Sequence, residues 1–188
     1  MPLAKPLRMD TDTTGSKTSY EKIIANFESK KSNVLIGTQM VSKGLDFGGV
    51  DTVGIMNADS LMNFPDFRAH ERAFQLMEQV AGRAGRRAGQ EGEVLIQCSD
   101  PKHPLLRQVV EHDYKAMAEM QLADRQKYFY PPYSRLIMIY MKGRYEDRLD
   151  RLANQYADTL RQTFGQRVLG PESPGIARIK NMYIRQLP

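Results

Sequence analysis

Apolar residues in the first part of the chain recur at the spacing of helices that bury one face. Tyr20 is followed by apolar residues three, four and seven positions later, which predicts an amphipathic helix over 17–28. A second such stretch predicts a helix over 66–81, whose inner stripe we assign to Ala73, Leu76, Met77 and Val80. Ahead of Asp10, Leu3 and Leu7 each lie next to a proline, and we expect no regular element there. We also expect that the first domain is truncated at its N-terminus.

Three short apolar runs predict strands over 34–37, 50–56 and 93–98. The run over 34–37 has no polar side chain, so we expect a buried strand. Strands that alternate with helices are typical of an open parallel α/β sheet. Functional loops of such sheets lie outside the carboxyl ends of the strands, and Thr38 begins a loop in that position.

The pattern changes after Cys98. We predict a short helix over 101–111 and a longer polar helix over 113–128, which two consecutive prolines end. An apolar run over 136–141 predicts another buried strand. A clear amphipathic helix over 149–164 and a final strand over 178–187 complete the pattern.

These elements predict a three-part organisation. An α/β domain with a parallel sheet and flanking helices would occupy 1–112, and a connecting helix would occupy 113–129. A small α+β domain, which we expect to be truncated, would occupy 130–188.

Composition narrows the possible partners and compartments. The 188 residues carry a formal net charge of +5, which favours a polyanionic partner. Cys98 is the only cysteine, so the chain has no internal disulfide framework and no all-cysteine metal site. No apolar run of about 18 residues is present to span a membrane. We expect a cytoplasmic protein that has no membrane partner.

The most informative chemistry lies in the stretch over 79–86. Two arginines lie three residues apart, each preceded by a glycine, and a glutamine precedes them on the helix; these residues are Gln79, Gly82, Arg83, Gly85 and Arg86. Guanidinium groups match phosphate oxygens, and glycine permits close approach of a phosphate chain. The alternative is a basic loop that only ends a helix.

The loop that begins at Thr38 is the second candidate site. The Thr38 hydroxyl follows a strand and can meet a phosphate, whereas Asp46 can accept hydrogen bonds from a ribose hydroxyl beside Gly44. The alternative is a structural turn in which Asp46 caps a helix.

Together the two stretches resemble motifs V and VI of superfamily 2 helicases, which belong to the second RecA-like lobe. The segments over 66–72, 103–106, 131–133 and 168–171 extend the resemblance to the PriA family of primosomal, replication-restart DNA helicases. The Pro-Pro-Tyr segment at 131–133 and the Leu-Gly-Pro segment at 169–171 lie outside the motor lobe. They argue against another motor of this class, such as a RecG-like fork translocase.

The resemblance implies roles for named residues. Arg83 and Arg86 would be arginine fingers, and Gln79 would sense the nucleotide or the attacking water. The nucleotide-binding set would comprise Gly44, Asp46, Gly82 and Gly85. Contacts to the backbone of single-stranded DNA would come from Thr38, Gln39 and Lys43.

The resemblance also implies what other parts of such a helicase supply. The chain has no Gly-x4-Gly-Lys-Ser/Thr loop, so ATP with Mg²⁺ would be held mainly by a first lobe, and the chain alone would be inactive. Zinc would belong to an upstream insertion, with no metal bound here. The implied activity is 3′→5′ helicase action in replication restart at bacterial forks, on single-stranded and branched DNA. Single-stranded DNA-binding protein and other primosome proteins would be its partners, and the protein would be associated with the nucleoid. A non-catalytic nucleic-acid-binding module with a degenerate motor fold is the alternative.

Several weaker signals favour structural roles. Asp66, Arg68 and Arg72 suit a salt-bridged surface helix more than a link between DNA and ATP sites. The three histidines lack metal-ligand spacing. Basic and aromatic residues alternate over 125–135, which suits either stacking on bases or packing between domains. The basic residues near the end are interpreted as solvated charges of a sheet edge; they are Arg178, Lys180 and Arg185.

Overall fold

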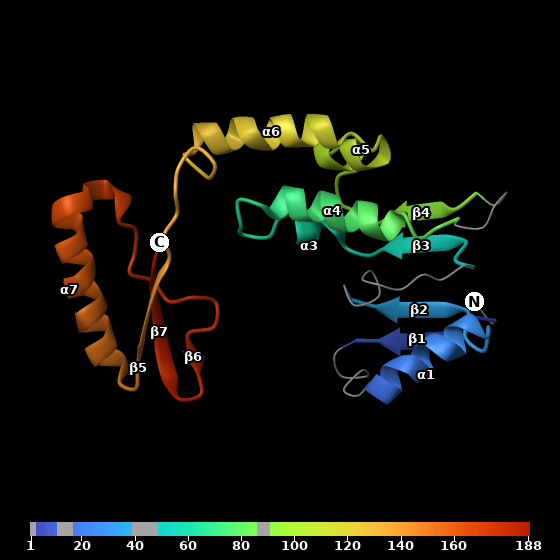
Figure 1. The fold of residues 1–188 in the computed structure, drawn as a ribbon, viewed down its shortest axis with the longest axis horizontal. Coiled ribbons are helices and arrows are strands. Elements are labelled where there is room, and N and C mark those ends of the chain that lie inside the picture. Colours follow the sequence, from blue (N-terminus) through green and yellow to red (C-terminus); the bar gives the residue numbers. More distant parts are fainter. Residues whose placement is uncertain (1–2, 11–16, 39–48, 86–90) are drawn as a thin grey trace. The chain divides into compact units, whose positions relative to one another are not determined.

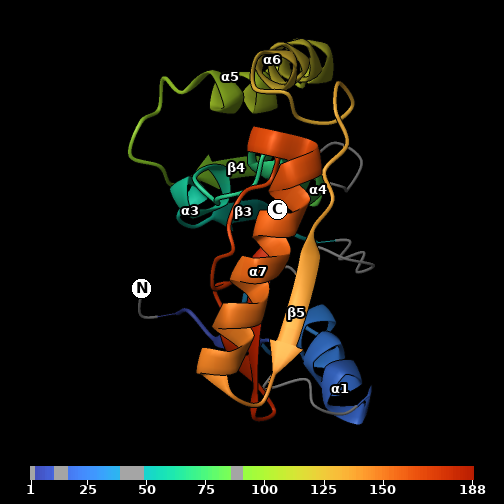
Figure 2. The ribbon, with the colours of Figure 1, turned by 90° about the vertical axis from the view of Figure 1, so that its left-hand side faces the viewer.

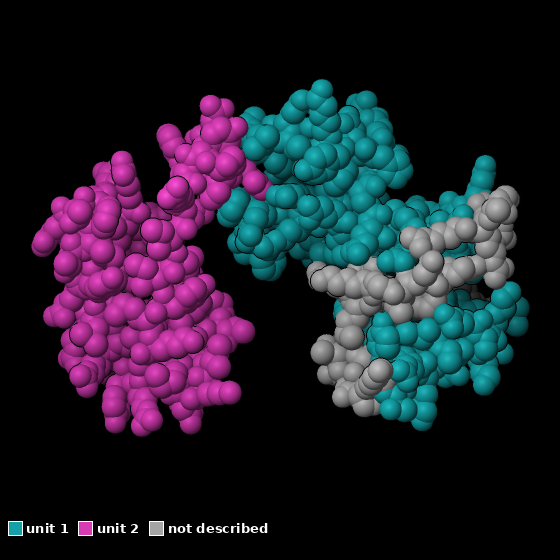
Figure 3. Space-filling view, in the orientation of Figure 1, with its two compact units in different colours: residues 1–124 teal, residues 125–188 magenta. Residues whose placement is uncertain are grey.

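A computed structural model describes residues 3–10, 17–38, 49–85 and 91–188. It divides into two compact units, Met1–Asp124 and Arg125–Pro188 (Figure 3). The division falls inside one helix, α6, within the segment that we predicted as a connector. The three-part organisation over 1–112, 113–129 and 130–188 stays a prediction. Within the described ranges, no helix is long and apolar enough to cross a membrane.

The first unit begins with a parallel strand pair covered by a helix. Strand β1 (Pro6–Met9) pairs with β2 (Val34–Gly37), and α1 (Lys17–Glu28) lies against the pair (Figure 1). Helix α1 has the predicted bounds, but the expectation of no element ahead of Asp10 was wrong. Leu7 and Met9 pack with α1, and proline is tolerated at the first residue of a strand, so Pro6 does not prevent a strand here.

The expectation that the strand over 34–37 is buried was also wrong. Val34 is 36% exposed and Ile36 is 56% exposed, whereas Leu35 packs against the α1 core. Successive side chains of a strand point to opposite faces, and α1 covers only one face of this pair. An uninterrupted apolar run therefore did not mean burial on both faces.

A second parallel pair completes the first unit. Strand β3 (Thr52–Ile55) pairs with β4 (Glu93–Ile96), and the four strands of the unit run in the same direction (Figure 1). The parallel arrangement is confirmed. In the part of the chain that the structure describes, however, the strands form two separate pairs and not one open sheet.

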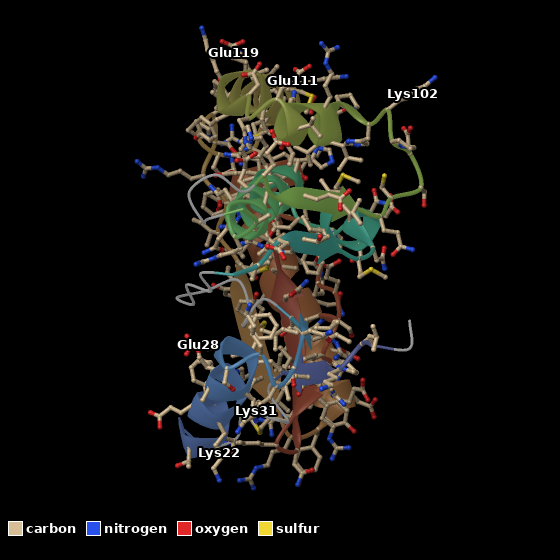
Figure 4. All side chains as sticks on the ribbon, turned by 90° about the vertical axis from the view of Figure 1, so that its right-hand side faces the viewer. Lys22, Glu28, Lys31, Lys102, Glu111 and Glu119 are labelled. Atoms are coloured by element: carbon tan, nitrogen blue, oxygen red, sulfur yellow. The ribbon has the colours of Figure 1, made fainter. Side chains whose placement is uncertain are left out.

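Four helices pack with the second pair: α3 (Ala58–Met62), α4 (Ala69–Ala81), α5 (Pro104–Val110) and α6 (Tyr114–Lys127). Their common core contains Ile55 of β3, Phe74 and Met77 of α4, Leu105 of α5 and Met117 of α6. The outer faces carry charged side chains such as Glu111 and Glu119 (Figure 4). Ala73 and Met77 of the predicted stripe are fully buried, and Leu76 and Val80 are half-buried.

Local hydrogen bonds set the helix starts. Helix α4 begins at Ala69, not 66, because the Asp66 carboxylate accepts a 2.8 Å hydrogen bond from the Arg68 N–H and holds a turn. Helix α5 begins at Pro104, not 101, because His103 Nδ1 accepts from the Leu105 N–H at 3.2 Å. Helix α3 was not predicted, since five residues are too few to show a helical period.

The second unit is a three-stranded antiparallel sheet with one long helix. The strands β5 (Ile139–Gly143), β6 (Arg178–Ile179) and β7 (Met182–Leu187) lie in the order β5-β7-β6. Helix α7 (Glu146–Phe164) runs along the sheet (Figure 2), and the short 3-10 helix η1 (Gly165–Arg167) follows it. The unit is α+β, as predicted.

Both strand predictions in this unit need correction. The final strand over 178–187 is a hairpin, because Lys180 and Asn181 adopt positive φ of 47° and 62°. The strand predicted over 136–141 begins only at Ile139, and Leu136 and Ile137 are exposed. Ile139 pairs with Leu187, the last residue of β7, so the residues before it have no strand opposite them.

Arg185 is buried, so its assignment as a solvated edge charge was wrong. It faces α7, where its Nη2 lies 2.9 Å from a Glu146 oxygen and 3.0 Å from an Asp150 oxygen. Hydrogen bonds from the guanidinium to Asp150 and then to Glu146 raise the pKa of Arg185. The sequence showed a basic residue near the end of the chain, but only the register places it against two carboxylates on α7.

Candidate functional site

The candidate phosphate-reading residues lie in a tight turn at the end of α4. Gln79 is exposed on the last turns of the helix. The Gly82 N–H donates to the Glu78 carbonyl at 3.0 Å, and the Arg83 N–H donates to the Val80 carbonyl at 3.0 Å. These bonds wind the chain past the helix end and fix the backbone of Arg83, whose side chain is half-buried.

Gly85 ties this turn to the strand layer. Its φ is +66°, in the left-handed region that favours glycine, and its N–H donates to the Val50 carbonyl at 3.0 Å. Val50 lies two residues ahead of β3. The turn is therefore anchored at both ends, by the helix through Gly82 and by the chain entering β3 through Gly85.

Gly92, which sequence reasoning missed, supports the turn from its other side. A Cβ atom at this position would lie 2.4 Å from the carbonyl carbon of Ala84 and 2.4 Å from the nitrogen of Gly85. The backbone at Gly92 can come this close to the backbone of Ala84 and Gly85 only because glycine has no Cβ. The available signal was a glycine directly ahead of the β4 strand, a position that can mark a close approach of two backbones.

The remaining predicted site residues are placed only in part. Thr38 is exposed and directly follows the last residue of β2. Gln39, Lys43, Gly44, Asp46 and Arg86 lie outside the described residues. The structure thus brings together Gln79, Gly82, Arg83 and Gly85.

Thr38 and the arginine turn belong to different ends of the strands. Thr38 is at the carboxyl end of β2, whereas Gly85 bonds to Val50 ahead of the amino end of β3. Both strands run in the same direction (Figure 1). The arrangement suits two separate contacts, one at each end of the layer, and not a single cluster.

The Asp66 cluster is a salt-bridged surface feature, as the sequence favoured. One Asp66 oxygen lies 3.2 Å from the Arg68 guanidinium and 2.9 Å from that of Arg72. The hydrogen bond from the Arg68 side chain, aided by its backbone N–H and by the charges of both arginines, lowers the pKa of Asp66. These contacts secure the start of α4, the helix that carries Gln79 at its other end.

The histidines have structural partners. His103 caps α5, His112 Nδ1 lies 2.9 Å from a Glu78 oxygen, and the Gln121 amide lies 3.2 Å from His70 Nδ1. Burial, with a smaller contribution from the adjacent His103, lowers the pKa of His70. Across the described ranges, no group of three or more histidine, cysteine or acidic side chains is arranged to hold a metal ion.

The basic and aromatic segment over 125–135 is exposed at several positions. Tyr128 is 59% exposed, Tyr133 is 47% exposed, and the Lys127 ammonium lies 5.1 Å from the centre of the Tyr128 ring. Both interpretations of this segment, base stacking and packing between domains, stay predictions.

Parallel strands covered by helices, with a glycine-arginine turn at the end of a long helix, define a helicase lobe. Residues 7–88 match the family model described as the helicase conserved C-terminal domain. This match confirms the predicted RecA-like second lobe as the fold class of the first unit.

Similar proteins define the family further. The chain is 39% identical over 185 residues to the replication restart protein PriA of Bacillus subtilis (strain 168), which covers 97% of this chain and 23% of that protein. It is 39% identical to PriA of Synechocystis sp. (96% of this chain, 22% of the relative) and 38% identical to PriA of Haemophilus influenzae (96% and 25%). The chain belongs to the PriA family of replication restart proteins. It spans about a quarter of the length of the curated relatives that it matches.

Proposed function

We propose that this chain is the second motor lobe and part of the C-terminal DNA-binding domain of an ATP-dependent 3′→5′ DNA helicase that acts in replication restart. Its substrates are single-stranded and branched DNA at bacterial forks, and its partners are single-stranded DNA-binding protein and other primosome proteins. It works in the cytoplasm, on the nucleoid. The single observation that carries the proposal is the doubly anchored turn that holds Arg83 at the end of α4.

The donor set of this turn fits the phosphates of a nucleotide better than a metal ion. Arg83 supplies a permanent positive charge, and Gly82 and Gly85 have no side chains to obstruct a phosphate chain. ATP with Mg²⁺ is held mainly by the first lobe, and bound ATP supplies the phosphoanhydride that is hydrolysed. Arg83 and Arg86 stabilise negative charge that develops on the phosphoryl group, and Gln79 orients the attacking water. An arginine finger contributes about 10³–10⁵ in rate.

The DNA contacts are assigned to the carboxyl end of β2. Thr38 is exposed there, and with Gln39 and Lys43 it meets phosphates of the single strand. Contacts to the backbone hold the strand without reading its sequence, as a translocating motor requires. Gly44 and Asp46 complete the nucleotide site near the ribose.

The test uses a chimera in which this chain replaces the matching segment of the Bacillus subtilis relative. Arg83→Ala and Arg86→Ala should each lower DNA-stimulated ATPase at least about 1,000-fold, with DNA affinity changed less than about 3-fold. Arg107→Ala is the matched control, because Arg107 is an exposed arginine paired with Glu111 on α5. Full ATPase in either finger variant, or equal loss in the control, would refute the assignment.

The chain by itself should hydrolyse no ATP, because it lacks a Walker A loop. The measurement is phosphate release by the purified chain with single-stranded DNA present. Turnover that survives further purification of the chain would show that the catalytic site lies within it.

A further inference from the structure

The second unit leaves one face of its sheet without a helix. Residues Met141 and Arg185 are cross-strand partners on the face covered by α7, where Arg185 meets Glu146 and Asp150. Side chains alternate along a strand, so Tyr140 and Lys142 belong to the opposite face. Tyr140 is 58% exposed there.

A shallow groove crosses this open face. It has a volume of about 320 Å³ and is lined by Tyr140, Lys142, Pro174, Ile176, Ile179 and Ile184. Ile184 forms a buried floor, whereas Ile176 and Ile179 are 67% and 48% exposed. Clustered exposed isoleucines on a soluble protein mark a surface that a partner covers.

The charge of the two units differs in sign. The second unit carries twelve lysines and arginines against five acidic residues, a net charge of +7. The first unit carries fifteen against seventeen, a net charge of −2. The excess positive charge of the chain, +5, therefore belongs entirely to the second unit.

Part of this positive charge belongs to the strand and turns that form the groove. Four of the five acidic residues are on α7, which covers the other face, and the fifth, Glu172, accepts a hydrogen bond from Gln186 at 2.7 Å. Strands β5, β6 and β7 contain no acidic residue. Lys142 lines the groove, and Arg144 and Lys180 lie in the turns that follow the lining residues Lys142 and Ile179. Arg178 lies over the ring of its cross-strand partner Tyr183 and so belongs to the face that α7 covers.

We propose that this groove docks a segment of a partner protein that presents apolar side chains interspersed with carboxylates. The apolar side chains fill the space between Ile176, Ile179 and Tyr140, and the carboxylates meet Lys142 and the basic residues of the adjoining turns. A nucleic acid strand would account for the charge but not for the lining, which has one aromatic ring and four aliphatic residues. Single strands are held by stacking of bases on aromatic side chains. The proposal is independent of the motor function assigned to the first unit.

The experiment measures binding to the full 188-residue chain by fluorescence anisotropy. The probe is a short labelled peptide in which leucine and aspartate alternate. Ile176→Asp and Ile179→Asp should each weaken binding at least about 10-fold, because each places a carboxylate in the apolar groove. Lys142→Glu should weaken binding several-fold and reduce its dependence on salt.

Leu152→Asp is the matched control, because Leu152 is 47% exposed on α7 and does not line the groove. It should leave peptide affinity unchanged, and thermal melting should show that all variants fold. Four results would overturn the proposal. The peptide does not bind, or its asparagine analogue binds equally well. Alternatively, a labelled oligothymidylate binds with an affinity that the two isoleucine variants lower, which would assign the face to nucleic acid. Finally, sedimentation shows a dimer that those variants dissociate, which would assign it to a second copy.

Discussion

Gly92→Ala is a sharp test of the arginine turn because the perturbation is a single methyl group. The new Cβ would lie 2.4 Å from two backbone atoms of Ala84 and Gly85 and 2.7 Å from the Ala84 Cβ. None of these neighbours is the end of a flexible side chain, so the contact cannot be relieved by a rotamer change. Ordinary van der Waals contact begins near 3.4 Å, and the turn must therefore move by about 1 Å.

That displacement acts directly on the finger. Arg83 directly precedes Ala84. The hydrogen bond from the Gly85 N–H to the Val50 carbonyl, which anchors the turn, would lengthen or break. A misplacement of about 1 Å in a catalytic group costs about 100-fold in rate. We expect kcat for DNA-stimulated ATPase of the chimera to fall by about that factor, with DNA affinity unchanged.

Gly54→Ala is the control, because it also replaces a glycine by alanine, here within strand β3. Among the described residues, no atom lies within 4 Å of a Cβ built at Gly54, so this variant should retain full ATPase. Melting temperatures separate local misplacement from loss of fold, because general overpacking would lower stability and DNA affinity together. Wild-type kcat in Gly92→Ala would refute the claim that this close approach positions Arg83.

Two further predictions concern stability. Burial lowers the pKa of His70 below its ordinary value of about 6.5, so the unfolded state binds more protons as pH falls through that value. The contribution of His70 to the free energy of unfolding should therefore be complete above about pH 6.5 and decrease below that pH. His70→Gln should flatten this pH dependence in urea titrations at several pH values. An unchanged slope would contradict the assignment. Arg185→Ala should lower the free energy of unfolding by about 3 kcal/mol, the lower end for a broken buried pair, because Glu146 and Asp150 are 48% and 42% exposed. Arg148 is an exposed arginine on α7, the helix that carries Glu146 and Asp150, and Arg148→Ala should change the free energy of unfolding by less than about 0.5 kcal/mol. Equal losses for the two variants in chemical denaturation would contradict the burial argument.

Some features of this protein were predictable because they depend on neighbours in sequence. The spacing of Tyr20, Ile23 and Phe27 was enough to place α1, whose bounds match the prediction. Glycines on both sides of Arg83 indicated a turn after α4, and the structure has one there. Helical periods and turn chemistry act over a few residues, so the chain itself carries this information.

Other features depend on contacts between residues far apart in sequence. Nothing in the order of residues says that Gly92 packs on the backbone of Ala84, or that Arg185 is held by Glu146 and Asp150. Burial followed the same rule: Leu35 is covered and Ile36 is exposed, because only one face of the β1–β2 pair meets α1.

The sequence by itself determined the class of lobe and the identity of the candidate phosphate-binding arginines, because both are properties of short motifs. The tertiary structure decided how the Arg83 turn is anchored, since that depends on where Val50 and Gly92 come to lie. It also decided which face of the second unit stays open, because strand register alone determines which side chains α7 covers.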